Sequence, residues 1–238
     1  MPLKTVMIPS EERKEDKRLK KIKDYEWLPT PMNGGMYVCG SAGAGKSSWL
    51  YSFYNEWCPM YFDEVVVFCA TKDSADTWNK LKQRNIVVLH KYSDAILDNY
   101  LKDLEEEQIQ RHKDGKFPLR VSILFDEMAG ARITNNSKPT ALDRLALNCR
   151  HYNVLYIIST QRFRIISNTL RQNVHYVVLY RMAKPDLKRV AEEFSDPLSP
   201  EDFLEMATKI TNMKHKYLFI DLRAQPEKRF RYEMNQII

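Results

Sequence analysis

The chain has 238 residues, of which 44% are hydrophobic and 11% aromatic, with a formal net charge of +6 and a pI near 9.0. This length suits one large α/β domain with a small appendage and is too short for two domains of generous size. No apolar run is long enough to span a membrane and the first residues lack a signal-peptide core, so we expect no membrane association. The positive charge favours an acidic partner such as nucleic acid, although charge alone is weak evidence.

Cysteine and histidine give no sign of a disulfide framework or a metal centre. The four cysteines are far apart without a C-x-x-C pair, and the five histidines show no metal-ligand spacing. We expect the cysteines to be reduced and buried in a cytosolic protein. They are Cys39, Cys58, Cys69 and Cys149.

Residues 1–31 are dense in charge from Ser10 to Lys23 and end in Pro29 and Pro31. Because apolar anchors are few, this segment is predicted to be an arm outside the core. It is either a solvated helix, which is the simpler interpretation, or a basic surface for phosphates or a protein partner.

Residues 40–47 read GSAGAGKS and match G-x-x-x-x-G-K-[ST], the phosphate-binding P-loop, at every fixed position. Three of the seven glycines of the chain fall in this segment, where the backbone must approach phosphates and adopt positive φ. A short apolar strand over 36–39 precedes the loop and a helix over 47–54 follows it, in the order that a P-loop requires. The sequence therefore predicts a nucleotide site here.

The residues after this helix alternate between apolar runs, typical of buried parallel strands, and helical periodicity. In chain order we expect a strand over 64–69, a helix over 73–83, a strand over 85–89 and a helix over 92–115. Asp73 or Ser74 is expected to cap the first of these helices, and Gly115 to end the second.

A second landmark is the apolar strand predicted over 120–125, which is followed by the adjacent carboxylates Asp126 and Glu127. Behind a P-loop, carboxylates at a strand end are typical of a Walker B motif, although such a pair can also cap the next helix. A polar and cationic loop over 128–140 comes next.

The remaining elements continue the same alternation. They are a helix over 141–150, a strand over 153–161, a short helix reaching 173, a strand over 175–180, helices over 184–194 and 200–210, and strands over 216–222 and 229–234. The last two strands, joined through Gln225 and Pro226, predict a terminal hairpin. The whole pattern predicts an α/β fold with a mostly parallel central sheet flanked by helices.

Parallel strands bring their carboxyl ends to one edge of a sheet, so the P-loop, Asp126, Glu127 and Gln161 are expected to converge there. The residues expected to bind the nucleotide are Gly40, Ser41, Ala42, Gly43, Ala44, Gly45, Lys46, Ser47 and Ser48. Glu127 would activate the attacking water as a general base, and Gln161 would sense the γ-phosphate or orient that water.

The cofactors expected at this edge are ATP and Mg²⁺. Lys46 would hold the β and γ phosphates, while Ser47 and Asp126 would hold the metal ion. Motor ATPases usually complete such a site with an arginine from a neighbouring subunit. The nearby candidates are Arg150, Arg164 and Arg171, each of which could equally be a surface or phosphate-contacting arginine.

These motifs resemble those of viral genome-packaging ATPases of the poxvirus type, a branch of the FtsK-HerA superfamily. The resemblance is carried by 40–47, by ILFDE at 123–127, by RH at 150–151 before the strand that ends in STQR at 159–162, and by LRQN at 170–173. The short length is similar to that of the packaging ATPases of virophages and other small viruses with double jelly-roll capsids.

The resemblance implies a RecA-like (ASCE) P-loop NTPase core, which we place at residues 32–195, with 196–238 as an extension of the same domain. It further implies a homo-oligomeric ring that drives double-stranded DNA into a preformed capsid, with an arginine acting in trans at Arg150 or Arg171. Capsid or portal-vertex proteins would be partners, and the protein would act in the cytoplasm of the infected cell, in a viral factory or with the virion.

Two other functions fit the P-loop. One is a kinase of a nucleotide or another small molecule, against which the adjacent carboxylates, Gln161 and the absence of an obvious arginine-rich lid argue. The other is a nucleotide-gated structural or capsid-assembly protein that binds ATP without turnover. For a DNA-translocating protein, the segment from Arg132 to Lys138 is a candidate for contact with DNA, or it is a plain surface loop.

Overall fold

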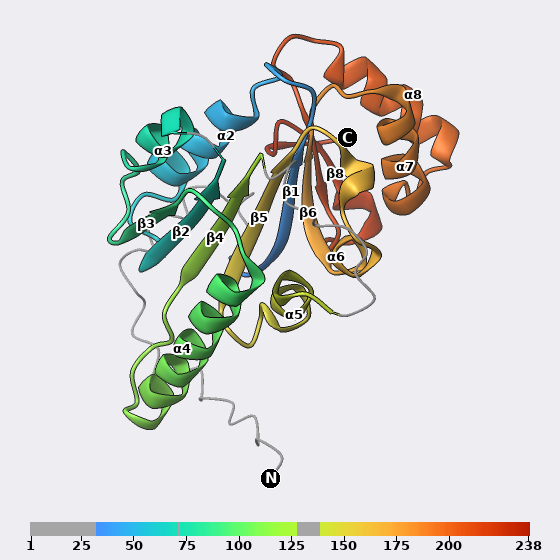
Figure 1. The fold of residues 1–238 in the computed structure, drawn as a ribbon. Helices are drawn as coiled ribbons and strands as arrows, with labels where there is room; N and C mark the ends of the chain where they lie inside the picture. The colour runs from blue at the N-terminus through green and yellow to red at the C-terminus, as the bar shows by residue number, and fades with distance from the viewer. Residues whose placement is uncertain (1–31, 71, 128–138) are drawn as a thin grey trace.

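The computed structural model describes residues 32–70, 72–127 and 139–238 of the chain. Within them one nine-stranded sheet has the order β3-β2-β4-β5-β1-β6-β7-β8-β9 (Figure 1). The strands are β1 (Gly34–Cys39), β2 (Glu64–Cys69), β3 (Ile86–Leu89), β4 (Val121–Asp126), β5 (Val154–Thr160), β6 (Val174–Leu179), β7 (Leu218–Asp221), β8 (Phe230–Tyr232) and β9 (Gln236–Ile237).

Neighbouring strands are parallel from β3 to β6, and β7, β8 and β9 are added antiparallel. This confirms the predicted α/β fold, with a mostly parallel sheet and a C-terminal β-hairpin made by β7 and β8. The short strand β9 was not predicted. Strand β8 ends at Tyr232, two residues earlier than expected, because Glu233 and Met234 both adopt positive φ, of 49° and 73°.

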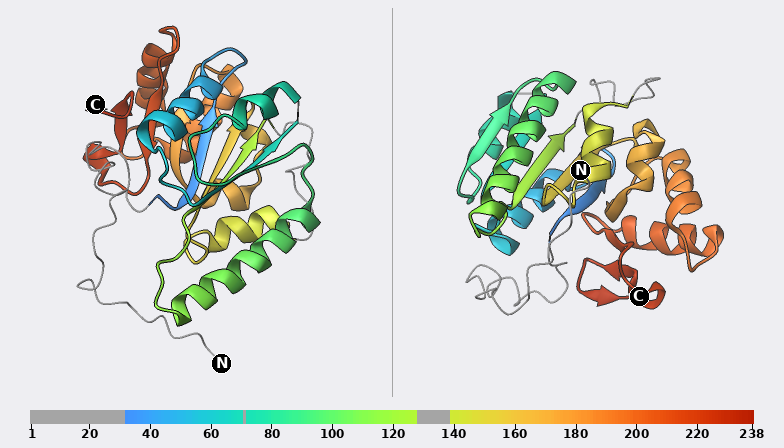
Figure 2. Two further views of the ribbon diagram at one scale, coloured as in Figure 1. Left: turned by 90° about the vertical axis from the view of Figure 1, so that its left-hand side faces the viewer. Right: turned by 90° about the horizontal axis from the view of Figure 1, so that it is seen from below.

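Helices cover both faces of the sheet (Figures 1 and 2). Along β1, Met36 and Val38 belong to one buried cluster and Tyr37 and Cys39 to the other, as expected for a strand with two buried faces. The first cluster lies under α2 (Lys46–Ser52), the π-helix η2 (Phe53–Trp57) and α3 (Lys72–Trp78). The second lies under α4 (Asp94–Lys113), α5 (Ala141–Asn148), α6 (Asn168–Gln172), α7 (Lys184–Phe194) and α8 (Pro200–Thr211).

Several helix ends follow directly from local sequence. The Ser93 hydroxyl accepts a hydrogen bond from the Ile96 N–H at the start of α4, and Gly115 follows its end with a φ of 66°. Thr140 and Asp143 form a reciprocal capping box at the start of α5. These caps explain why the predicted limits of α4 and the start of α5 agree with the structure.

The predicted helix over 73–83 is wrong in its limits. Helix α3 begins at Lys72, so Asp73 and Ser74 lie in its first turn and neither is the N-cap. It ends at Trp78, and the following turn is held by the buried Gln83 side chain, which donates to the carbonyl oxygens of Tyr54 and Cys58. These partners are distant in sequence, so local periodicity could not indicate the end of the helix.

The predicted helix over 141–150 ends earlier, at Asn148, and the strand after it begins at Val154. The helix predicted over 47–54 instead continues through the π-helix η2, whose end is marked by a 2.9 Å hydrogen bond from the Cys58 N–H to the Phe53 carbonyl. The π-helix η2 therefore lengthens the helical segment after the P-loop, and its residues Phe53 and Tyr54 join the same buried cluster as α2.

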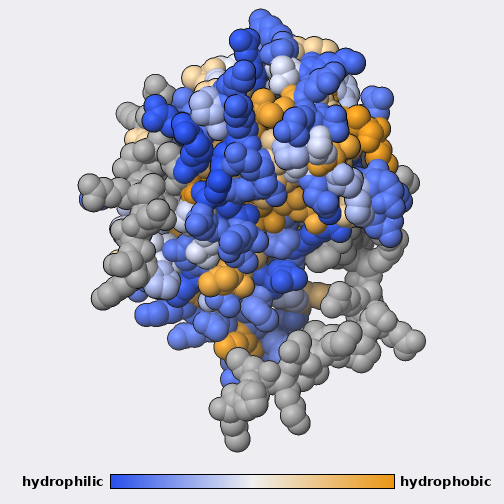
Figure 3. Space-filling view, turned by 90° about the vertical axis from the view of Figure 1, so that its right-hand side faces the viewer, coloured by the Kyte–Doolittle hydropathy of each residue, from blue (hydrophilic) through white to orange (hydrophobic). Residues whose placement is uncertain are grey.

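The side of the molecule that carries α7 and α8 is largely hydrophilic, with apolar side chains gathered in parts of its upper half (Figure 3). Among the described residues, no helix combines the length and the apolar composition needed to cross a bilayer.

Candidate active site

The carboxyl ends of three adjacent strands meet where the sequence predicted a site. In the register of the sheet, Cys39 of β1 pairs with Thr160 of β5, and Asp126 of β4 pairs with Ser159 of β5. The N–H of Gly40 donates to the Thr160 carbonyl oxygen at 3.1 Å, which fixes the start of the P-loop against β5. The P-loop and the carboxylates after β4 therefore share one edge of the sheet.

The P-loop uses its glycines for two different reasons. Gly43 and Gly45 have φ angles of 70° and 112°, which residues with a Cβ rarely adopt. Gly40 is required by space, because a Cβ there would lie 2.5 Å from the Cβ of Tyr180. The loop is also held from outside by a 2.8 Å hydrogen bond from the Ser41 N–H to the Arg181 carbonyl oxygen.

Lys46 is buried, with 4% of its surface exposed, and its ammonium group folds back onto the P-loop. The Nζ atom donates to the carbonyl oxygens of Gly40 at 2.9 Å and Ser41 at 3.1 Å. Burial lowers the pKa of Lys46, and the negative charges of Glu127 and, more weakly, Asp126 oppose that change. Among the described residues the hydrogen-bond partners of this cation are thus neutral carbonyl groups, which phosphate oxygens could replace.

Asp126 is a buried carboxylate with one satisfied oxygen. Oδ2 accepts a 2.9 Å hydrogen bond from the indole Nε1 of Trp78, while Oδ1 is buried and has no hydrogen-bond partner among the described residues. Burial raises the pKa of Asp126, and the Trp78 indole and the Ser159 hydroxyl oppose this rise. An unpartnered buried carboxylate oxygen is the kind of donor that a hard cation such as Mg²⁺ requires.

Glu127 and Gln161 lie together at the exposed rim of this edge. The Gln161 amide Nε2 donates to the Glu127 carboxylate Oε1 at 3.1 Å, although 34 residues separate them in sequence. Glu127 adopts a positive φ of 51°, and its N–H donates to the Ser159 carbonyl oxygen at 3.2 Å. This left-handed backbone conformation marks the end of β4, directly after Asp126.

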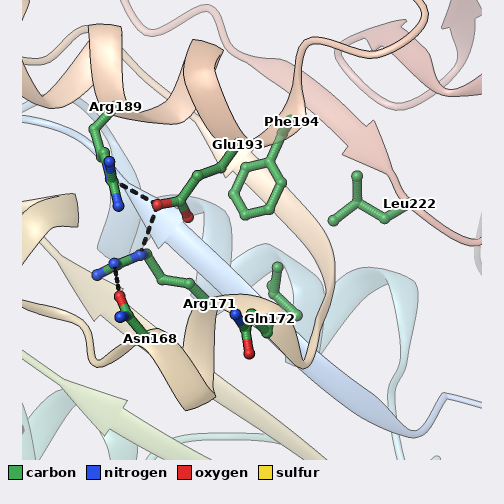
Figure 4. Close-up of a pocket in the computed structure, with 8 residues that line it drawn as sticks. Asn168, Arg171, Gln172, Arg189, Glu193, Phe194 and Leu222 are labelled. Carbon is green, nitrogen blue, oxygen red and sulfur yellow. Dashed lines mark hydrogen bonds and ion pairs between the residues drawn. The ribbon is translucent and has the colours of Figure 1, made fainter.

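The arginine candidates occupy three different places. Arg171 has 9% of its surface exposed, and its guanidinium pairs with Glu193 at 2.9 Å and donates to Asn168 (Figure 4). It also donates to the Ile166 carbonyl oxygen. Glu193 is shared with Arg189 at 2.7 Å. In this conformation the Arg171 side chain is fully engaged within its own chain.

Arg150 lies before β5, at the amino edge of the parallel sheet and away from the P-loop of the same chain. Burial, with smaller contributions from the charges of Arg223 and Arg150, lowers the pKa of His175 to about 4. Arg164 follows β5 at the carboxyl edge, with 60% of its side chain exposed and its guanidinium 3.5 Å from Asp186. Action of Arg150 or Arg171 in trans stays a prediction. The predicted N-terminal arm, residues 1–31, and the segment from Arg132 to Lys138 lie outside the described residues.

A cavity of about 440 Å³ lies beside the P-loop. One wall is formed by residues 41–44, another by residues 211–216 from the end of α8 and the turn after it, and Tyr180 and Arg181 lie between them. The sequence analysis included residues 41–44 in the site but not Tyr180, Arg181 or residues 211–216. Tyr180 and Arg181 follow β6, the other neighbour of β1, so the rule that strand ends converge could have found them.

A family model described as "Poxvirus A32 protein" matches residues 27–224. The chain belongs to this family. The match spans the P-loop, Asp126, Glu127 and Gln161, and so confirms the resemblance inferred from these motifs. A comparison with curated proteins gave no significant match.

Several solved structures share the fold of this poxvirus A32 family member. The DNA-packaging ATPase B204 of Sulfolobus turreted icosahedral virus aligns with a TM-score of 0.62 and 15% identity, over 84% of this chain and 96% of B204. B204 of Sulfolobus turreted icosahedral virus 2 in complex with AMPPCP aligns with a TM-score of 0.60 and 14% identity, over 85% and 98% of the two chains.

EssC ATPases 2 and 3 from Geobacillus thermodenitrificans align with a TM-score of 0.55 and 15% identity, over 83% of this chain and 38% of EssC. At these identities the likeness concerns the fold. The chain thus shares the fold of these ATPases, in agreement with the predicted α/β fold with a mostly parallel sheet.

Proposed function

We propose that this chain is an ATP-hydrolysing motor that drives double-stranded DNA into a preformed viral capsid. Membership of the poxvirus A32 family and the likeness to the packaging ATPase B204 support a DNA-packaging NTPase. The observation that carries the proposal for this chain is the meeting of Lys46, Asp126 and the Glu127–Gln161 pair at one edge of the sheet.

Each of these residues has a distinct part in phosphoryl transfer. Lys46 exchanges its carbonyl partners for oxygens of the β and γ phosphates, and thereby stabilises the charge that develops during cleavage. Glu127 accepts a proton from the attacking water at its carboxylate, and the amide of Gln161 holds that carboxylate in place.

The residues that would hold Mg²⁺ are Ser47, with its exposed hydroxyl, and Asp126, through its unpartnered Oδ1. When bound, the ion would neutralise phosphate charge and orient the phosphate chain. The nucleoside part of ATP would lie in the cavity between residues 41–44 and residues 211–216, because that cavity opens directly beside the phosphate loop.

The proposed assembly is a homo-oligomeric ring in which an arginine of one subunit completes the site of the next. Arg150 is the better of the two candidates, since Arg171 would first have to leave its pair with Glu193. Double-stranded DNA would be the translocated substrate, and capsid or portal-vertex proteins the docking partners, in the viral factory of an infected cell. The segment from Arg132 to Lys138 remains our candidate for contact with DNA.

Replacement of Glu127 by Gln tests the proposed chemistry. Glu127→Gln keeps the size of the side chain and its contact with Gln161 but removes the base, so we expect turnover to fall by roughly 10²- to 10⁴-fold with ATP binding retained. The matched control is Glu205→Gln, at an exposed position of α8. Phosphate release is measured with and without double-stranded DNA, which should stimulate the wild-type protein.

Two outcomes would refute the proposal. Tight ATP binding without phosphate release, in the presence and absence of DNA, would indicate a nucleotide-gated assembly protein. Transfer of the γ-phosphate to a small molecule would indicate a kinase. Undiminished turnover in Glu127→Gln would remove Glu127 from the role of base.

A further inference from the structure

The indole of Trp78 makes a contact that the roles above leave unexplained. Trp78 is the last residue of α3, is 1% exposed, and donates from Nε1 to Asp126 Oδ2 at 2.9 Å. We propose that Trp78 is a positioning residue that holds the Asp126 carboxylate so that Oδ1 is presented to the metal ion of the nucleotide. This inference rests on the proposed nucleotide site.

The first step in the argument is the geometry of the donor. Trp78 belongs to the buried cluster on the α2 and α3 face of the sheet, so its ring is fixed by packing on several sides. An indole N–H is a donor only and needs an acceptor when buried. Here the acceptor is a carboxylate oxygen, and the contact therefore restricts rotation of the Asp126 carboxylate about its Cβ–Cγ bond.

The second step concerns the other carboxylate oxygen. A carboxylate that served only to satisfy the indole would be expected to find a partner for both oxygens, yet Oδ1 is buried and makes no hydrogen bond of acceptable geometry among the described residues, although the Ser159 hydroxyl lies near the carboxylate. The two charged groups that act on Asp126 are Glu127, which repels it, and Lys46, which attracts it. Oδ1 is thus held at the nucleotide edge by the indole on its opposite oxygen.

The third step is the general behaviour of metal sites. Partners that hold a ligand from behind fix its orientation, and their loss typically weakens metal affinity by about 10- to 100-fold. The effect of Trp78 should therefore appear in the dependence of nucleotide binding on Mg²⁺. Replacement of Trp78 should not change nucleotide affinity measured without Mg²⁺.

The test uses the full chain and a fluorescent, non-hydrolysable ATP analogue. Nucleotide affinity is measured over a titration of Mg²⁺ and again in EDTA. For Trp78→Phe we expect the Mg²⁺ concentration that gives half of the maximal increase in nucleotide affinity to rise by about 10-fold. The nucleotide affinity in EDTA should equal that of the wild type. The control is Trp57→Phe, a half-buried tryptophan packed against the same cluster, which should leave both quantities unchanged.

A second pair of variants separates positioning from packing. If Trp78 acts through Asp126, then Trp78→Phe should cause no further loss of the Mg²⁺ effect in a chain that already carries Asp126→Ala. The inference would be overturned if the double variant lost more Mg²⁺-dependent nucleotide affinity than Asp126→Ala alone. It would also be overturned if Trp78→Phe left the Mg²⁺ dependence of nucleotide affinity unchanged. If Trp78→Phe fails to fold, benzothienylalanine at this position keeps the ring size and replaces only the N–H by sulfur.

These measurements need neither hydrolysis nor DNA. A wild-type chain that binds the magnesium nucleotide but shows no DNA-stimulated turnover would contradict the proposed motor and still decide the role of Trp78. A wild-type chain whose nucleotide affinity is indifferent to Mg²⁺ would overturn the inference itself.

Discussion

Asp126→Asn should stabilise the protein in the absence of nucleotide and metal ion. The wild-type carboxylate is buried, with 3% of the residue exposed, and its Oδ1 lacks a hydrogen-bond partner. In the variant, the amide oxygen can accept from Trp78 Nε1 and the amide nitrogen can donate to the Ser159 hydroxyl, which lies near the wild-type carboxylate but makes no hydrogen bond of acceptable geometry among the described residues. One substitution would thus satisfy two buried polar groups.

The size of the effect follows from the cost of an unsatisfied buried polar group, which is about 1–3 kcal/mol. Because an amide must still be desolvated, we expect the free energy of unfolding to rise by on the order of 1–2 kcal/mol. For a chain of this size each kcal/mol corresponds to a Tm change of roughly 2–4 °C. The same variant should lose the Mg²⁺-dependent part of its nucleotide affinity, so stability and function change in opposite directions.

The pH dependence gives an independent check on the cause. Burial raises the pKa of Asp126 in the folded state above its unfolded value, so the folded protein holds this proton more tightly than the unfolded chain does. The penalty is therefore complete at neutral pH, begins to shrink as pH falls through the raised pKa of the folded state, and is gone below the pKa of the unfolded chain. The stability advantage of Asp126→Asn should be largest near pH 7 and should narrow on acidification.

The assay is urea denaturation in EDTA, without nucleotide, with Asp186→Asn as the matched control. Asp186 is equally buried at 3% exposed, but its carboxylate accepts from the Arg164 N–H at 3.0 Å and faces the Arg164 guanidinium at 3.5 Å. Loss of that charge should lower the free energy of unfolding by about 1 kcal/mol or more. If Asp126→Asn destabilises the protein as Asp186→Asn does, the reasoning about an unpartnered carboxylate is refuted.

Two further predictions concern the backbone around the strand ends. Gly40→Ala should lower the free energy of unfolding by about 3 kcal/mol, because its Cβ would lie 2.5 Å from the Cβ of Tyr180. Gly43→Ala has nothing within 4 Å of its Cβ and should lower it by only about 1 kcal/mol, because of its φ of 70°. Equal losses in urea denaturation would contradict the steric argument. His175 Nδ1 accepts a hydrogen bond from the Gly35 N–H, and the pKa of His175 is lowered to about 4 in the folded state. The unfolded chain therefore takes up this proton first, so the free energy of unfolding should fall as pH drops from about 6.5 towards 4. The slope should be at most about 1.4 kcal/mol per pH unit. His175→Asn should flatten this dependence in denaturation curves measured at pH 7 and pH 5, and an unchanged slope would show that other groups cause it.

The fold could be predicted in large part because its signals are local. The strands β2, β4, β5 and β6 are predominantly apolar, and the parallel order that brings their carboxyl ends together follows from the helices between them. The same rule predicted the edge at which Lys46, Asp126 and Gln161 now lie. The pairing of Gln161 with Glu127 is consistent with the expectation that both belong to one site.

The features that could not be predicted depend on contacts between distant parts of the chain. The segment that follows α3 is tied, through the Gln83 side chain, to two carbonyl groups more than 20 residues away. The engagement of Arg171 depends on Glu193, which lies on a different helix. Neither partner leaves a periodic signal near the residue that it controls.

Trp78 shows why a site can be hidden inside a pattern that is interpreted correctly. A tryptophan among apolar residues predicts a core position, and the ring of Trp78 does lie in the core. Its one polar atom nevertheless reaches the carboxylate that the P-loop motif assigns to the metal ion. Sequence periodicity indicates which face of an element is buried but not where a buried N–H points, so in this fold the packing side of α3 and the supporting side of the active site are the same surface.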